Sequence, residues 1–136
     1  MMTDVIRPRA ILTDDHPAML DTVSTLLQRE FEIVATTSDG MRALDAVTSF
    51  KPELLVLDIS MPGWDGFETA RRVMEVSPET KVLFLTTHEN TAYMDAAREM
   101  GAGCVIKGLM KRDLLPAARG AIAGELFYSE VNKKLS

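Results

Sequence analysis

The chain lacks the features that mark secreted, membrane-spanning and nucleic-acid-binding proteins. A single cysteine, Cys104, excludes an internal disulfide, and residues 1–8 lack the apolar core of a signal peptide, so we expect a cytoplasmic protein. No apolar stretch is long enough to span a bilayer, which predicts no membrane contact. The net charge is −5 and the basic residues are dispersed, so the chain itself is not expected to bind DNA. The two histidines, His16 and His88, have no third ligand at suitable spacing, which argues against a zinc site.

Four short apolar runs, each ending at a polar residue, are the main positive signal in the sequence. In chain order they end at Asp14-Asp15, Asp58, Thr86-Thr87 and Lys107. Continuous apolar runs of this length are typical of strands buried on both faces, as in a parallel sheet covered by helices. Ligands of such sheets bind at the carboxyl ends of the strands. We therefore expect three carboxylates, a hydroxyl and an ammonium group to meet at one edge of a sheet.

Strand-like and helix-like segments alternate five times along 136 residues, a length that fits one domain. A (βα)5 order with right-handed crossovers predicts a doubly wound parallel five-stranded sheet in a three-layer α/β sandwich. Pro17 suits the first turn of one helix, and Asp65 and Glu68 have the spacing of a capping box at another. Pro116 and Gly120 interrupt the apolar residues that recur at helical spacing in the last predicted helix. We therefore expect that helix to begin late or to be kinked.

Asp58 is the hardest of the polar strand-end residues to explain structurally. A carboxylate that closes a buried strand must be solvated, paired or bound to a metal ion, because burying it bare is costly. Taken alone, Asp14-Asp15 fits a favourable position at a helix N-terminus, Thr86 an ordinary strand residue and Lys107 a solvated lysine. Three carboxylates at one edge repel each other unless a cation relieves them, and two or three suffice for Mg²⁺.

The joint placement of these residues resembles the receiver domain of two-component response regulators, over a stretch from about Arg9 to Gly124. The resemblance rests on residues 14–17 (DDHP), 58–66 (DISMPGWDG) and 101–107 (GAGCVIK). Within that family the chain is most similar to the NarL/FixJ (LuxR-type) group. This narrower resemblance rests on the DDHP opening, on residues 85–88 (LTTH) and on residues 121–129 (AIAGELFYS).

The resemblance implies a flavodoxin/CheY-like fold and a phospho-accepting switch that is not an enzyme. Asp58 would take a phosphoryl group from a sensor histidine kinase or from a small phosphodonor, and Lys107 and Thr86 would contact that group. The implied ligands of Mg²⁺ (or Mn²⁺) are Asp15, Asp58, the backbone carbonyl of Ser60 and, through water, Asp14.

The resemblance also implies a longer protein. Members of the NarL/FixJ group usually carry a C-terminal helix-turn-helix domain, so we expect a receiver domain at 1–124 and the start of an interdomain linker at 125–136. DNA binding would belong to that further domain, and phosphorylation would favour a homodimer. We expect Phe127 and Tyr128 to pack on a neighbouring surface, and Ser129 to cap a linker helix through Val131 and Leu135.

Three alternatives remain at the level of sequence. The first is a stand-alone relay receiver whose aromatic tail folds back on its own core. The second is a Mg²⁺-dependent phosphohydrolase with an Asp nucleophile, although Ser60 stands where such enzymes need a general acid. The third is a pseudo-receiver that serves only as an interaction module, which the complete acidic set disfavours.

Two positions depart from the pattern of many receivers. Cys104 stands where a Tyr or Phe usually swings inward with the switch threonine, and Gly108 stands where a Pro usually follows the lysine. A cysteine side chain cannot transmit the movement of the switch threonine by the inward swing that an aromatic ring makes. We therefore expect the signal to pass through the loop from Thr86 to Asn90 and the fourth helix.

Overall fold

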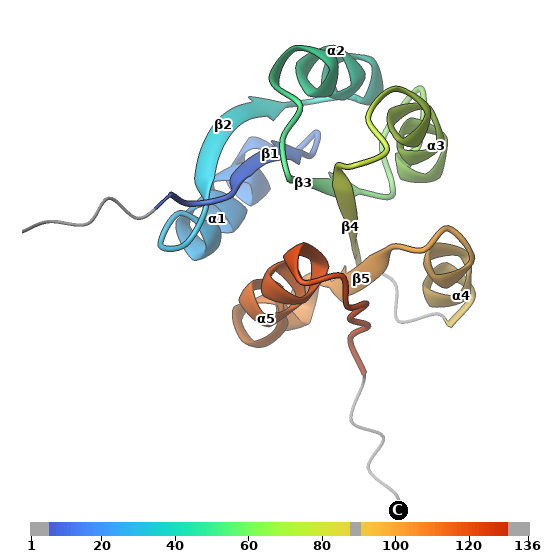
Figure 1. The fold of residues 1–136 in the computed structure, drawn as a ribbon. Helices are drawn as coiled ribbons and strands as arrows, with labels where there is room; N and C mark the ends of the chain where they lie inside the picture. The colour runs from blue at the N-terminus through green and yellow to red at the C-terminus, as the bar shows by residue number, and fades with distance from the viewer. Residues whose placement is uncertain (1–5, 88–90, 131–136) are drawn as a thin grey trace, which may run out of the picture.

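The structure, a computed structural model that describes residues 6–87 and 91–130, is a parallel sheet between two layers of helices (Figure 1). The strands are β1 (Arg9–Thr13), β2 (Glu32–Thr37), β3 (Leu54–Asp58), β4 (Lys81–Thr86) and β5 (Gly103–Ile106). The helices are α1 (Pro17–Leu27), α2 (Gly40–Phe50), α3 (Gly66–Val76), α4 (Thr91–Glu99) and α5 (Met110–Ile122). The strand order is β2-β1-β3-β4-β5, with every neighbouring pair parallel. The predicted doubly wound sandwich is confirmed.

The two faces of the sheet carry separate hydrophobic cores, because successive strand residues point to opposite sides. Leu54 and Val56 of β3 pack with α1 and α5, whereas Leu55 and Leu57 pack with α2, α3 and α4. Figure 1 shows the same division of the helices between the two faces. All five residues of β3 are buried, which explains why its sequence is continuously apolar up to Asp58.

Local sequence signals account for three of the helix starts. Pro17 occupies the first turn of α1, and the carboxylates of Asp39 and Asp65 each accept a backbone N–H at 2.8 Å at the start of α2 and α3. The predicted capping box of α3 forms only in this direction, since the Glu68 side chain pairs with arginines one turn further along.

The last helix does not begin late, so that part of the expectation is wrong, and the alternative of a kink stays a prediction. A 3₁₀ turn over Lys107–Leu109 leads directly into α5 at Met110, and the helix continues through Pro116 to Ile122. Pro116 is exposed, so water can hydrate the carbonyl that loses its partner there. On the opposite side Leu114 and Ala118 are fully buried, and this packing outweighs the poor local propensity.

The segment after α5 lies on the domain itself. The Cys104 backbone N–H donates to the Phe127 carbonyl at 2.8 Å, and the Tyr128 hydroxyl donates to the Ala102 carbonyl at 2.8 Å. Phe127 and Tyr128 are each partly buried against one of the two cores. The expectation that these aromatics pack on a neighbouring surface is therefore wrong. Val131 and Leu135, assigned to a linker helix, lie outside the described residues.

No helix within residues 6–87 and 91–130 combines the length and the apolar character that crossing a membrane requires.

Candidate functional site

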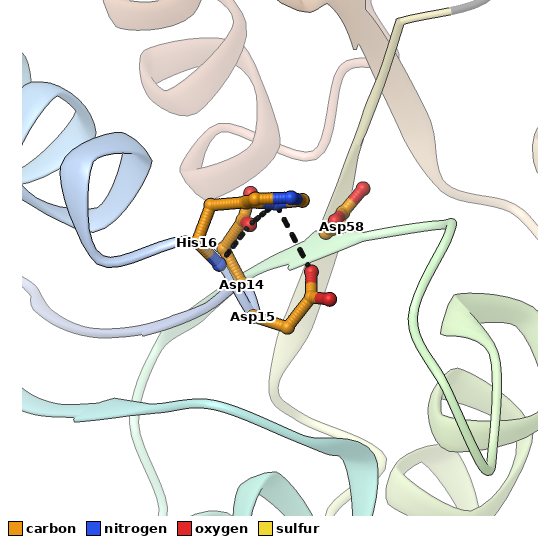
Figure 2. A group of neighbouring side chains, drawn as sticks. All are labelled: Asp14, Asp15, His16 and Asp58. Carbon is orange, nitrogen blue, oxygen red and sulfur yellow. Dashed lines mark hydrogen bonds and ion pairs between the residues drawn. The ribbon is translucent and has the colours of Figure 1, made fainter.

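The carboxyl ends of β1 and β3 bring together the carboxylates of Asp14, Asp15 and Asp58, as the sequence predicts (Figure 2). The two strands are parallel neighbours in which Thr13 pairs with Leu57, so Asp14 and Asp58 follow at the same level. Both are 2% exposed. One ligand atom from each of the three carboxylates and from His16 lies within 4.8 Å of the others. This arrangement matches the oxygen-rich donor set that Mg²⁺ or Mn²⁺ takes.

Lys107 joins the cluster from the end of β5. Its Nζ lies 2.9 Å from Asp14 Oδ2 and 3.3 Å from Asp58 Oδ1, and its side chain is 8% exposed. A single ammonium offsets one of the three carboxylate charges. The remaining excess of negative charge is what a divalent cation would neutralise.

The surroundings of Asp58 disfavour its charged form. Burial raises the pKa of Asp58 above its usual range, and the charge of Asp14 raises it further. Lys107 and the Ser60 backbone N–H, which donates to Asp58 Oδ1 at 3.2 Å, lower the pKa without reversing the shift. A bound cation would favour the ionised form, which is the form that can attack phosphorus.

Asp15 has an oxygen suited to a cation. Its Oδ1 is buried and accepts no hydrogen bond from any described residue, although the Nδ1 atom of His16 lies 3.2 Å away. An acceptor without a donor is unfavourable in a folded protein unless an ion or water occupies the position. The residues present therefore fit a hard divalent cation.

His16 belongs to this cluster although its sequence spacing provides no reason to include it. Its backbone N–H donates to Asp14 Oδ1 at 2.9 Å, and its ring Nδ1 lies 3.1 Å from the same oxygen (Figure 2). The backbone bond is an Asx turn that orients Asp14. The available signal is its position directly after two aspartates at a strand end.

Thr86 and Ser60 occupy the same edge of the sheet. Thr86 ends β4, is 1% exposed and pairs in register with Ile106, the residue before Lys107. Ser60 follows Asp58 by two residues and is exposed. Their assigned roles in phosphoryl and metal binding stay predictions. His88 and Asn90, in the loop expected to carry the signal, lie outside the described residues.

Gly66 lets the loop after β3 fold back against Asp58. A Cβ atom at this position would lie 2.6 Å from the Asp58 carbonyl oxygen and 2.6 Å from Ile59 Cα. The Gly66 N–H donates to the Ile59 carbonyl at 2.7 Å, which closes the loop. Any larger residue would have to displace the backbone that carries Asp58.

Comparison with known proteins identifies the family. The response regulator receiver domain family matches residues 10–119. The chain belongs to this family. A receiver domain is a signalling phospho-acceptor, not an enzyme, and it implies a cognate histidine kinase. The cluster of Asp14, Asp15 and Asp58 is typical of a receiver domain's metal site.

Individual relatives place this receiver domain near LuxR-type regulators. It is 34% identical over 123 residues to the oxygen regulatory protein NreC of Staphylococcus haemolyticus. That match covers 88% of the chain but 57% of NreC, so the chain spans only part of the relatives it matches. A LuxR-family two-component response regulator from Aurantimonas sp. SI85-9A1 is 28% identical, with a TM-score of 0.84 over 90% of this chain and 89% of that chain.

Two further solved structures agree with the CheY-like fold. The signal receiver domain of a NarL response regulator from Mycobacterium tuberculosis is 28% identical, with a TM-score of 0.78 over 88% of this chain and 98% of that chain. The non-phosphorylated receiver domain of RcsB from Escherichia coli has a TM-score of 0.84 over 92% of this chain and 100% of that chain; at 24% identity it speaks for the fold alone.

Cys104 of this receiver domain is an inert core residue. It is fully buried in β5, and burial raises the pKa of its thiol to about 12. The position where many receivers carry a swinging aromatic is thus filled by a small side chain within the core.

Proposed function

We propose that this cytoplasmic receiver domain accepts a phosphoryl group on Asp58 and thereby controls DNA binding by a C-terminal helix-turn-helix domain. The donor is a phosphohistidine of a sensor histidine kinase or a small phosphodonor. The observation that carries the proposal is the placement of Asp58 at the end of the central strand, in contact with Lys107 and within ligand distance of Asp14 and Asp15.

The chemistry is an in-line displacement at phosphorus. A carboxylate oxygen of Asp58 forms the new O–P bond while the P–N bond to the donor imidazole breaks, and the bonding electrons leave with the imidazole nitrogen. Asp15, Asp58 and the Ser60 carbonyl would hold Mg²⁺ (or Mn²⁺), with Asp14 acting through water. When bound, the cation supplies positive charge for the transferring oxygens.

Lys107 supplies the second positive charge. Its Nζ contacts both Asp14 and Asp58, so it is within reach of an oxygen of the phosphoryl group on Asp58. The Thr86 hydroxyl then hydrogen-bonds another phosphoryl oxygen. The phosphorylated protein favours the conformation in which Thr86 is drawn inward, which shifts an existing equilibrium.

The output part of the proposal rests on the relatives. The chain covers 57% of NreC, and the LuxR-family regulator from Aurantimonas shares its fold. A net charge of −5 disfavours direct contact between this chain and DNA phosphates. We assign residues 1–124 to the receiver and residues 125–136 to the start of a linker, and phosphorylation is expected to favour a homodimer that binds DNA more tightly.

A stand-alone relay receiver is the second candidate, and the packing of Phe127 and Tyr128 on their own domain favours it.

The test compares DNA binding at matched salt by the full-length protein, its Asp58→Asn variant and residues 1–136 alone. Asp45→Asn, an exposed change on α2, is the control. Phosphorylation should raise DNA affinity only where Asp58 is intact and the further domain is present. Two results would contradict the transcription-factor proposal and favour the stand-alone relay receiver. They are specific DNA binding by residues 1–136 alone and a native gene that ends near Ser136.

A further inference from the structure

The segment after α5 extends the sheet at its outer edge. The chain turns at Gly124, where φ is +84°, and then runs parallel to β5, with Cys104 and Tyr128 forming a bridge. Both backbone groups of Cys104 bond to the segment: its N–H donates to the Phe127 carbonyl at 2.8 Å, and its carbonyl accepts the Ser129 N–H at 3.0 Å. This edge of β5 would otherwise expose unpaired backbone groups.

A buried polar cluster locks this segment in place. Ser129 is 6% exposed, and its hydroxyl donates to Asp113 Oδ2 at 2.7 Å while accepting the Ile106 N–H at 3.0 Å. Asp113 is 4% exposed and is held by two bonds from Arg112, at 2.7 and 3.1 Å. We call the three side chains of Arg112, Asp113 and Ser129 the clasp. Arg112 also donates to the Glu130 carbonyl at 3.3 Å, so it contacts the segment directly.

The fit between the segment and the domain is close on either side of the clasp. A Cβ atom on Gly103 would lie 2.8 Å from the Phe127 carbonyl oxygen, so only glycine lets the two backbones approach. The Tyr128 ring lies under the guanidinium group of Arg98, 4.1 Å from the ring centroid. The segment thus contacts α4, β5 and α5 together.

The clasp is bonded to the residue that precedes Lys107. Ser129 holds the backbone N–H of Ile106, and the following residue, Lys107, holds Asp14 and Asp58 through its ammonium group. Ser129 therefore holds the backbone one residue before Lys107, whose side-chain nitrogen contacts both carboxylates. The two bonds of the Ser129 hydroxyl, to Asp113 and from the Ile106 N–H, are buried, so a displacement of the backbone at Ile106 and Lys107 weakens them.

We propose that the clasp is a regulated attachment of residues 127–130, closed while Lys107 pairs with Asp14 and Asp58 and weakened when Lys107 turns to a phosphoryl group on Asp58. This inference rests on the proposed function and adds the route by which the site reaches the chain beyond the domain. The structure shows the clasp closed together with the Lys107 contacts to both carboxylates. Because coupling between two sites is reciprocal, opening the clasp by mutation must also favour the phosphorylated arrangement.

Beryllofluoride with Mg²⁺ serves as the phosphoryl probe, and the readouts are its affinity and amide exchange in residues 125–130. Ser129→Ala removes both hydroxyl bonds, and Ser49→Ala, an exposed change on α2, is the matched control. In the parent, beryllofluoride should speed exchange in residues 125–130. In Ser129→Ala that exchange should already be fast, and beryllofluoride should bind about fivefold more tightly. Ser49→Ala should match the parent.

Three outcomes overturn the inference, and they separate its failure from that of the proposed function. A parent that binds no beryllofluoride refutes the proposed function and this inference with it. A parent that binds the probe while exchange in residues 125–130 stays unchanged refutes the clasp alone, as does a Ser129→Ala affinity within about twofold of the parent or weaker. If Ser129→Ala does not fold, Arg112→Ala, at an exposed guanidinium, takes its place with the same expected direction.

Discussion

Replacing Asp58 by asparagine is expected to stabilise the metal-free domain at neutral pH. Asp58 lies in a cluster whose ligand atoms are within 4.8 Å of one another, so its charge is repelled by those of Asp14 and Asp15. At an effective dielectric constant of about 20, and taking the 4.8 Å upper limit as the separation, each repulsion is about 3.5 kcal/mol. The attraction between Asp58 and Lys107 at 3.3 Å is about 5 kcal/mol on the same scale.

Asparagine removes both repulsions and the one attraction, while Lys107 keeps its shorter contact to Asp14 at 2.9 Å. The net electrostatic gain is about 2 kcal/mol before screening. Asp15 has a side chain 28% exposed, so solvent reduces its share of the repulsion and the gain becomes about 1 kcal/mol. For a domain of this size that corresponds to a rise in Tm of about 3–4 °C.

The sign of the pH dependence follows from the raised pKa of Asp58. Because the folded state binds the proton more tightly than the unfolded state, this group lowers stability as pH rises from the ordinary aspartate range through the folded pKa. The Asp58→Asn variant lacks this titrating group and therefore escapes that loss. Its advantage over the parent should be small at about pH 4, grow as pH rises and level off above the folded pKa.

The assay is urea and thermal unfolding of the parent, Asp58→Asn and the exposed control Asp45→Asn in EDTA across this pH range. Adding Mg²⁺ should then stabilise the parent much more than Asp58→Asn, because the ion binds the folded state only. The reasoning would be refuted by an Asp58→Asn protein no more stable than the parent at neutral pH, or by an advantage that does not grow with pH.

Three further substitutions test the parts of the site separately. Asp15→Asn should weaken Mg²⁺ binding by about 10–100-fold, measured by the fluorescence of the only tryptophan, Trp64, in the loop after Asp58; unchanged affinity would remove Asp15 from the ligand set. Gly66→Ala should destabilise the domain by about 1–3 kcal/mol and slow phosphorylation, because its Cβ meets the Asp58 backbone at 2.6 Å. Gly120→Ala, with its nearest neighbour at 3.5 Å, is the control and should be neutral or stabilising in urea unfolding. Thr86→Ala should still be phosphorylated, because the hydroxyl is not the nucleophile, yet lose the change in amide exchange of α4 that beryllofluoride causes in the parent; a preserved change would exclude Thr86 from the switch.

The sequence predicts the sheet and much of the site because both depend on strand ends. Parallel strands buried on both faces require continuous apolar runs, and the residue that ends each run must then lie at the carboxyl edge of the sheet. Asp14, Asp58 and Lys107 follow this rule, and the structure brings their charged groups together. No detailed knowledge of packing is needed for that inference.

The features that the sequence does not reveal depend on contacts between distant residues. Ser129 binds Asp113 and Ile106, which lie 16 and 23 positions away, so its sequence position indicates only a helix cap. The start of α5 at Met110 is set by burial of its inner face against the sheet, which overrides Pro116. Spacing alone does not include His16 in a metal site, whereas the turn at Asp14 brings its ring to the cluster.

The central claim is that Asp58 is the sole acceptor of the phosphoryl group, and intact-protein mass measurement tests it most directly. The parent, incubated with phosphoramidate or acetyl phosphate, should gain a single phosphoryl group in Mg²⁺ and none in EDTA. Asp58→Asn should gain none in either condition, while the control Asp45→Asn should behave as the parent. Modification of Asp58→Asn to the same extent as the parent would contradict the account.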